Sequence, residues 1–201
     1  MKTFTMLIII QVFTLCNMSY AQKTSKQKEK AFINWFFQKA ETRPYVTPYA
    51  KDSITVYASG LSANRIDYIK KELSIDTLID LECKKNKVIL SKEEKVYIYR
   101  QLDGMKTQVW QKNLIENSIL INKDTISTIF KRPVSAQLNF FSKYPHGYSF
   151  FSKPIFIRDN TLCIFYCGYN CFDLCFDDKL LILRKEGEDW VELISLIDTI
   201  V

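Results

Sequence analysis

Apolar residues recur at helical spacing in two early stretches of the chain. Residues 24–40 carry phenylalanine, tryptophan and isoleucine on one wide face, and Thr24 with Gln27 fits the capping-box pattern at the start. Residues 63–73 follow the same period, with Ser62 as the expected N-cap. Both stretches are therefore predicted as helices that bury an apolar face against the core.

The next helix has the clearest beginning in the sequence. Ser91 and Glu94 form an S-x-x-E capping box, which predicts a helix that starts there and ends near Gly104. The positions expected to face inward, the last of them just past that end, are Ile98, Leu102 and Met105.

The other segments between residues 53 and 143 predict shorter elements. β-Branched and aromatic residues favour strands, and Pro133 separates two short helical stretches. The expected strands are residues 53–57, 77–83, 87–90 and 119–121, and the expected short helices are residues 125–131 and 135–143.

The last third of the chain alternates strand-forming stretches with polar turns. Residues 154–169 predict two strands around Asp159 and Asn160, and residues 179–197 predict two more around a polar turn at 185–189. Helices mainly in the first two-thirds, followed by C-terminal antiparallel β-hairpins, favour an α+β fold.

The first 21 residues differ in composition from the rest. Lys2 is followed by an apolar stretch at 4–15 and by small residues ending at Ala21. This layout is that of a secretory signal peptide cleaved between Ala21 and Gln22. We therefore expect an exported protein, periplasmic or extracellular, with a single α+β domain at 22–201.

Two other interpretations of this N-terminal segment remain open. A membrane anchor needs about 20 apolar residues, whereas this stretch is shorter and contains Gln11. A lipid attached to Cys16 is the second, although Phe13, Thr14 and Leu15 precede it in place of the small residues typical of lipoprotein signals. No later apolar run is long enough to cross a membrane, so no transmembrane segment is expected in the mature chain.

Composition fits an ordinary globular domain, with 47% hydrophobic and 25% charged residues. The net charge of +6 becomes +5 when Lys2 leaves with the signal peptide. The densest basic stretches, KTSKQKEK and ECKKNK, contain acidic residues and lack the interleaved aromatic side chains of a nucleic-acid groove. Nucleic acid is therefore not an expected partner, and composition points to no other partner.

Features of known catalytic sites are scarce in this sequence. His146 is the single histidine, and its place between a proline and a glycine is typical of an exposed turn. The chain has no nucleophile elbow, zinc-protease helix or phosphate-binding glycine loop. Asp173, Asp177 and Asp178 lack the spacing of a calcium loop, so a solvated turn is the preferred interpretation. Catalysis is therefore less expected than binding, and no cofactor is expected.

Four of the cysteines recur at every fourth position in CIFYCGYNCFDLC, residues 163–175. Strand-forming residues at the start of this segment predict an extended chain. On it, Cys163 and Cys167 share a face but lie about 13 Å apart, too far for a disulfide. Cys171 and Cys175 flank a stretch where the chain must turn toward the next strand, and a turn can bring the two sulfur atoms together.

An exported protein meets an oxidising environment, which favours a structural Cys171–Cys175 disulfide. The alternatives are free or transient thiols, or a metal site. Zinc sites normally combine two short-spaced ligand pairs in separate loops, so no metal is expected. Five cysteines remain after cleavage of the signal peptide, so at least one of Cys83, Cys163 and Cys167 lacks an intrachain partner.

The segment FFSKPIFIRDNTLCIFYCGYNCFDLC, followed by KLLILRKEGEDWVEL, resembles the closing section of uncharacterised exported proteins from Gram-negative bacteria. Those proteins share a serine-proline strand start, an aromatic strand, a C-x₃-C loop and a final strand that ends near a tryptophan. The corresponding residues here are Ser152 and Pro154, residues 165–169, Cys171 and Cys175, and Trp190. The resemblance implies the strand arrangement and the disulfide, and it brings no known activity.

Two functional classes follow from these observations. The first is a non-catalytic binding or envelope-associated module with a structural disulfide loop. The second is a thiol-redox or metal-binding protein that uses the C-x₃-C pair, although thiol-exchange enzymes typically use Cys-X-X-Cys at a helix N-terminus. We expect the first class.

Overall fold

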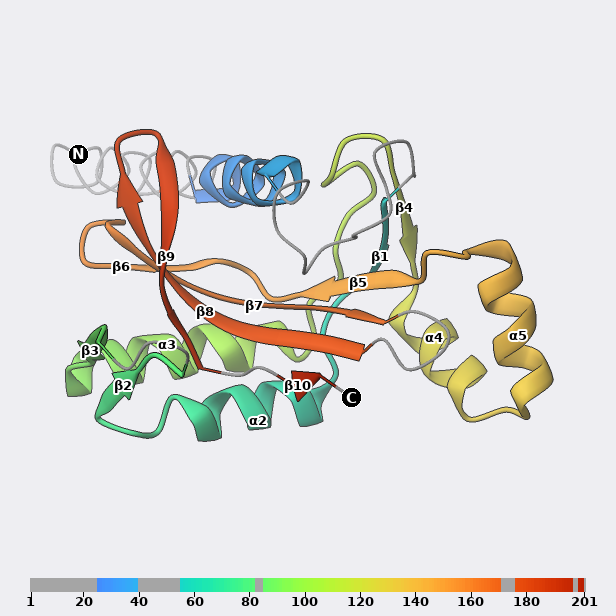
Figure 1. The fold of residues 1–201 in the computed structure, drawn as a ribbon, viewed down its shortest axis with the longest axis horizontal. Coiled ribbons are helices and arrows are strands. Elements are labelled where there is room, and N and C mark those ends of the chain that lie inside the picture. The colour runs from blue at the N-terminus through green and yellow to red at the C-terminus, as the bar shows by residue number, and fades with distance from the viewer. Residues whose placement is uncertain (1–24, 40–54, 82–84, 171–175, 197–198, 201) are drawn as a thin grey trace, which may run out of the picture.

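An eight-stranded mixed sheet runs through the middle of the described part of the fold, with helices against both of its faces (Figure 1). The computed structural model describes residues 25–39, 55–81, 85–170, 176–196 and 199–200. In these ranges the chain combines helices and strands in one mixed α/β fold. The sequence-based prediction of a mixed fold is therefore confirmed at this coarse level.

The described helices lie before and between the strands of the first part of the chain, and strands alone follow α5. The helices are residues 25–39, α2 (Ala63–Glu72), α3 (Lys92–Met105), α4 (Lys123–Phe130) and α5 (Val134–Lys143). The strands of the large sheet are β1 (Thr55–Ala58), β4 (Ser118–Ile121), β5 (Tyr148–Phe151), β6 (Ile155–Ile157), β7 (Leu162–Asn170), β8 (Phe176–Glu186), β9 (Asp189–Ser195) and β10 (Thr199–Ile200). A separate small sheet pairs β2 (Thr77–Ile79) with β3 (Lys87–Ile89).

The large sheet joins a parallel part to an antiparallel part. Its order is β10-β8-β7-β5-β1-β4, with β6 also paired to β7 and β9 to β8. β1 runs parallel to both β4 and β5, whereas the pairs made by β7 and β8 are antiparallel.

This arrangement differs from the expected separation of helices and strands. α5 ends at Lys143, beyond the first two-thirds of the chain, and β1 and β4 join the same sheet as the C-terminal strands. Parallel neighbours require a long crossover connection, usually a helical one. The helices between β1, β4 and β5 lie in such crossovers, which is why helices and strands are interspersed as far as β5.

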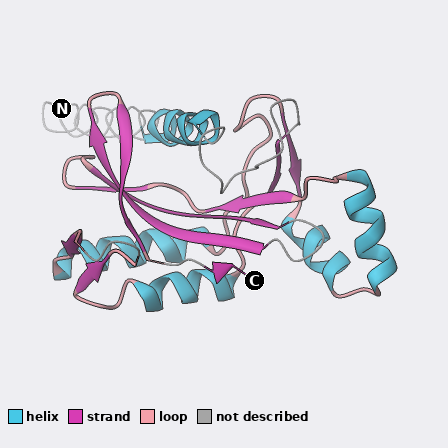
Figure 2. Cartoon of the chain, viewed as in Figure 1, coloured by secondary structure: helices cyan, strands magenta, loops and turns pink. Residues whose placement is uncertain are grey.

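Two apolar clusters fill the spaces on the two sides of the sheet, and Figure 2 shows the helices that cover them. β7 contributes to both clusters because successive side chains of a strand alternate between faces. Cys163 and Phe165 belong to the cluster under residues 25–39, whereas Ile164 and Tyr166 belong to the cluster with α2 and α3.

The aromatic face predicted for residues 24–40 is confirmed as part of the core. The ring of Phe165 lies 5.0 Å from the ring of Phe32 and 4.8 Å from that of Phe36, centroid to centroid. Both contacts are edge-on, which is a favourable geometry for aromatic pairs. The first described helix is therefore docked on the C-terminal strands.

The predicted starts of α2 and α3 are confirmed, and α3 ends one residue beyond the predicted Gly104. The Ser62 hydroxyl accepts a hydrogen bond from the Arg65 amide at 3.4 Å, and Ser91 and Glu94 form a complete capping box. α3 runs through Gly104 to Met105. The following residue keeps a right-handed helical backbone, so no left-handed glycine terminates this helix.

Candidate functional site

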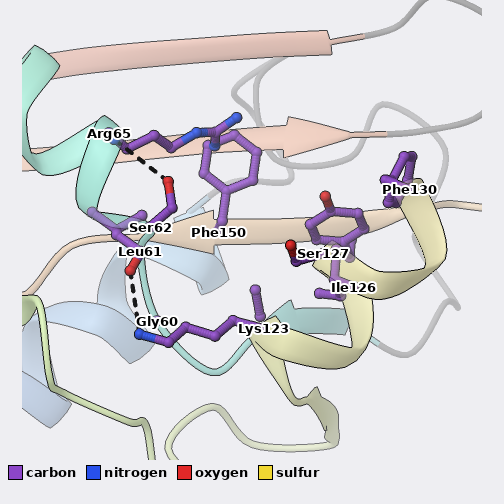
Figure 3. Close-up of a pocket in the computed structure, with 11 residues that line it drawn as sticks. Gly60, Leu61, Ser62, Arg65, Lys123, Ile126, Ser127, Phe130 and Phe150 are labelled. Atoms are coloured by element: carbon purple, nitrogen blue, oxygen red, sulfur yellow. Dashed lines mark hydrogen bonds between the residues drawn. The ribbon is translucent and has the colours of Figure 1, made fainter. Parts of the chain in front are cut away.

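A cavity of about 200 Å³ lies where α2 and α4 begin, beside the start of β5 (Figure 3). β1 and β4 are parallel neighbours, so the chain leaves both strands at the same edge of the sheet and enters α2 and α4 there. In sheets of this kind, ligands commonly bind outside the carboxyl ends of the parallel strands. The lining residues are Ala58, Gly60, Leu61, Ser62, Arg65, Lys123, Ile126, Ser127, Phe130, Tyr148 and Phe150.

Two helix N-termini meet at this cavity. Ser62 caps α2, and the side chain of Asn122 caps α4 by accepting a hydrogen bond from the Asp124 amide at 2.7 Å. Each helix N-terminus carries a partial positive charge of roughly half an elementary charge. The converging termini therefore favour negative charge in the space between them.

Two cationic side chains add to this positive potential. The Arg65 guanidinium lies 3.5 Å from the centroid of the Phe150 ring, and Figure 3 shows it above that ring. The Lys123 ammonium approaches two backbone carbonyl oxygens, those of Leu61 at 3.5 Å and Lys106 at 3.4 Å. The eleven described lining residues include no carboxylate, and the nearby Asp124 side chain is exposed.

The loop between β1 and α2 forms one wall of the cavity, and its close approach to the backbone of Gln108 requires a glycine. A Cβ atom at Gly60 would lie 2.7 Å from the carbonyl oxygen of Gln108, closer than real Cβ atoms approach backbone. The loop is also fixed by Ser59, whose hydroxyl accepts a hydrogen bond from the Lys123 amide at 3.0 Å. The starts of α2 and α4 are thus joined directly by this loop.

Aromatic rings form the opposite wall. Tyr148 and Phe150 are two residues apart on β5, so their side chains share one face of the strand. The ring of Tyr148 lies 6.2 Å from that of Phe130 on α4 and 6.3 Å from that of Phe150. This wall presents apolar surface beside the two cations.

Tyr148 also supplies a polar group that has no partner among the described residues. The residue is 9% exposed and lines the cavity, yet its hydroxyl makes no hydrogen bond to any described group. Burial raises the pKa of Tyr148, and the charge of Arg65 opposes that increase. The phenol is therefore protonated at neutral pH and can donate a hydrogen bond into the cavity.

Tyr166 and Asp178 lie behind this wall. The ring of Tyr166 is 6.1 Å from that of Phe150, and its hydroxyl donates a hydrogen bond to the buried carboxylate of Asp178. Burial raises the pKa of Tyr166, while Arg65 lowers it and Asp178 raises it further. The solvated turn expected for the aspartate cluster is therefore wrong for Asp178, which is buried at the start of β8.

Two larger hollows have less suitable chemistry for a specific site. One, of about 350 Å³, lies between the helix of residues 25–39 and the β8–β9 turn, and the other, of about 460 Å³, lies beside Lys153. Both carry charges of both signs, and in the second Lys153 pairs with Glu29 at 3.7 Å. The smaller cavity is favoured because its described lining combines positive charge with aromatic and aliphatic surface and contains no carboxylate.

The residues singled out in the sequence do not form this cavity. Cys171, Cys175, Ala21 and Gln22 lie outside the described residues. His146 is exposed in the turn after α5, as predicted, and is not a lining residue. Among the residues that the structure describes, no group of three or more His, Cys, Asp and Glu side chains is placed to hold a metal ion.

The two described cysteines on β7 behave as small apolar residues. Cys163 is fully buried and Cys167 is 5% exposed, and both belong to the cluster under residues 25–39. Burial raises the pKa of the Cys163 thiol well above its usual value, which disfavours the reactive thiolate. Cys163 therefore acts as a small apolar residue of the core.

The cavity residues come from three separate segments, residues 58–65, 123–130 and 148–150, and sequence patterns singled out a residue in only one of them. Ser62 was recognised as a helix cap, whereas Arg65, Lys123 and Tyr148 have no local signature of binding. Asn122 before an apolar helical stretch was the one further signal available, since asparagine is a preferred N-cap.

Comparison with family models, with curated proteins and with solved structures finds no match to this chain. None of the described helices is both long and apolar enough to cross a membrane.

Proposed function

We propose that this chain is an exported, non-catalytic binding module and that the cavity between α2, α4 and β5 is its ligand site. The observation that carries this proposal is the lining of the cavity, which combines the cations Arg65 and Lys123 with the aromatic residues Tyr148 and Phe150. Ligand sites are typically apolar cavities with a few convergent polar groups, and this lining has that composition.

The lining residues favour binding over catalysis. The hydroxyl of Ser62 is engaged in the α2 cap, and His146 is not a lining residue. The described lining residues therefore offer hydrogen-bond donors and positive charge but no paired nucleophile and general base.

Export is proposed from the N-terminal pattern, and the fold is compatible with it. Cleavage after Ala21 would leave residues 25–39 intact, and this helix supplies Phe32, Ile33 and Phe36 to the core. The mature chain would thus keep every described element.

A structural disulfide between Cys171 and Cys175 belongs to the same proposal. Asn170 at the end of β7 and Phe176 at the start of β8 are direct cross-strand partners. Residues opposite each other in a sheet have Cα atoms about 5 Å apart, so the two cysteines start from neighbouring points. A thiol-redox or metal-binding role of this C-x₃-C pair is the second candidate function.

Blocking the cavity tests the binding function. We expect a library of single-ring fragments, neutral and charged, to shift the backbone amide NMR signals of residues 58–65, 123–130 and 148–150. Ser127→Trp places a large ring at the mouth of the cavity and should abolish these shifts. Thr128→Trp on the same exposed helix turn points away from the cavity and should retain them.

Shifts that gather elsewhere on the protein, or that persist in Ser127→Trp, would show that this cavity is not the ligand site. Folding of both variants is checked by their thermal unfolding, since both positions are exposed.

A further inference from the structure

We propose that the cavity binds a small monocarboxylic acid whose body is a single flat apolar ring, an inference that rests on the binding function proposed above. The cavity walls carry three separate features that specify such a ligand: positive charge, apolar surface and limited volume.

The charge of the cavity selects an anion. Arg65 and Lys123 are lining residues, no described lining residue is acidic, and two helix N-termini point into the same space. Asp124 in the first turn of α4 offsets part of this potential, but its side chain is exposed and does not line the cavity. A cationic ligand would meet two cations and no carboxylate among the described lining residues.

Arg65 is oriented to receive a carboxylate. Its guanidinium lies over the Phe150 ring at 3.5 Å, so that ring packs against one flat face of the group. The N–H donors of arginine lie in the guanidinium plane and match the two oxygens of a carboxylate. Stacking on Phe150 therefore fixes the plane in which a carboxylate would be held.

Tyr148 provides a second donor for the same group. Its hydroxyl lacks a partner among the described residues, and its raised pKa keeps the phenol protonated through neutral and mildly alkaline pH. A protonated phenol donates to a carboxylate, whereas a phenolate would repel it. Tyr148 and Arg65 thus supply donors from two sides of the cavity.

The volume and the remaining walls define the body of the ligand. An apolar cavity of about 150 Å³ is large enough to hold benzene. The cavity here is about 200 Å³, which is room for one ring and one carboxylate. Leu61, Ile126 and Phe130 give the ring apolar neighbours that inorganic phosphate could not use.

Four probes separate the charge of the ligand from its ring: benzoate, benzyl alcohol, benzylammonium and inorganic phosphate. Calorimetric titration of the mature protein measures their affinities. We expect benzoate to bind more tightly than benzyl alcohol by roughly tenfold or more, the range for hydrogen bonds to a charged group. Benzylammonium and phosphate should show no binding in the cavity.

Two variants with matched controls test the proposed contacts. Arg65→Gln should weaken benzoate binding by roughly tenfold or more and leave benzyl alcohol binding unchanged, while Arg100→Gln, at an exposed position of α3, should change neither. Tyr148→Phe keeps the ring and removes only the hydroxyl, so it should weaken benzoate by several-fold. Tyr144→Phe, which is outside the lining, is its control.

The outcomes separate the acid specificity from the binding function itself. If benzyl alcohol or benzylammonium binds as tightly as benzoate, the carboxylate specificity is wrong and the binding function stands. If phosphate binds as tightly as benzoate, the proposed requirement for a flat apolar ring in the ligand is wrong. If none of the four binds and the fragment library also produces no shifts around the cavity, the proposed function itself fails.

Discussion

Phe150 lies across the backbone of Gly168, its direct partner in the β5–β7 pair. A Cβ atom at position 168 would collide with the Phe150 ring and would lie 2.8 Å from the Asp177 carbonyl oxygen. The same ring supports the Arg65 guanidinium from the other direction. The absence of a side chain at Gly168 therefore makes room for the Phe150 ring, on which the Arg65 guanidinium packs.

Gly168→Ala should destabilise the fold by about 1–3 kcal/mol, the usual cost of overpacking a core. Chemical denaturation measures this change in the free energy of unfolding. Gly104→Ala is the matched control, because a Cβ there meets no atom within 4 Å and the position is inside α3. We expect that change to stabilise by about 0.5–1 kcal/mol, since alanine is the better helix former.

The signs of the two stability changes show whether a Cβ atom at residue 168 collides with the Phe150 ring. If both glycine variants were stabilising, the Phe150 ring would have room to move away from residue 168. Combining Gly168→Ala with Phe150→Leu should recover part of the lost stability, because the smaller side chain relieves the collision.

The cysteines also make a prediction at the scale of single residues. Alkylation of the native exported protein should leave Cys163 unlabelled because it is fully buried. Cys171 and Cys175 should label only after reduction and should map to each other as one linked pair. The intact mass should correspond to a chain that begins at Gln22. Free labelling of both Cys171 and Cys175 without reductant would instead favour the thiol-redox or metal-binding alternative.

Among the elements, α3 is anchored more firmly at its start than at its end. Glu94 accepts a hydrogen bond from the Ser91 amide at 2.8 Å and from Arg158 at 2.8 Å. Arg158, in the turn between β6 and β7, also donates to the Ile89 carbonyl at 2.7 Å. The Glu94 carboxylate thus joins the cap of α3 to the turn between β6 and β7, and Arg158 joins that turn to the end of β3.

This junction predicts a pH dependence of stability. The hydrogen bond from Arg158 lowers the pKa of Glu94. A carboxyl whose pKa falls on folding stabilises the protein fully above its unfolded pKa of about 4.3, and the stabilisation is lost as the pH falls through the folded pKa. Glu94→Gln should therefore cost about 1–2 kcal/mol at pH 7. The difference from the unmodified protein should shrink below about pH 4.

Urea denaturation at a series of pH values measures this difference. Glu116→Gln is the control, since that side chain is exposed and forms no ion pair with a described residue. A cost of Glu94→Gln that stayed constant from pH 7 to pH 3 would show that the ionised carboxylate is not what stabilises the junction.

How well an element could be predicted depends on how local its signal is. α2 and α3 were predicted to within a residue or two because Ser62, Ser91 and Glu94 act on backbone groups within the next helical turn. The end of α3 was misplaced at Gly104, because a glycine terminates a helix only when the chain needs a left-handed residue there. Local chemistry determined the starts, and tertiary packing determined the end.

Across the whole molecule, the sheet and the cavity depend on contacts that no single segment encodes. The strand at 119–121 was predicted, but its parallel pairing with β1 joins residues separated by α2, the small sheet and α3. The cavity exists only because that pairing brings Arg65 and Lys123 to one edge, where β5 adds Tyr148. For that reason composition and motifs did not locate this cavity.

The order in which the chain is made has a consequence for the helix of residues 25–39. The rings of Phe32 and Phe36 pack on Phe165, which lies in the last third of the chain. During synthesis this helix therefore emerges long before the surface that covers it, and such late, non-local contacts slow folding. Until β7 is synthesised, the newborn chain exposes the aromatic face of this helix, and exposed apolar surface of this kind is prone to aggregation.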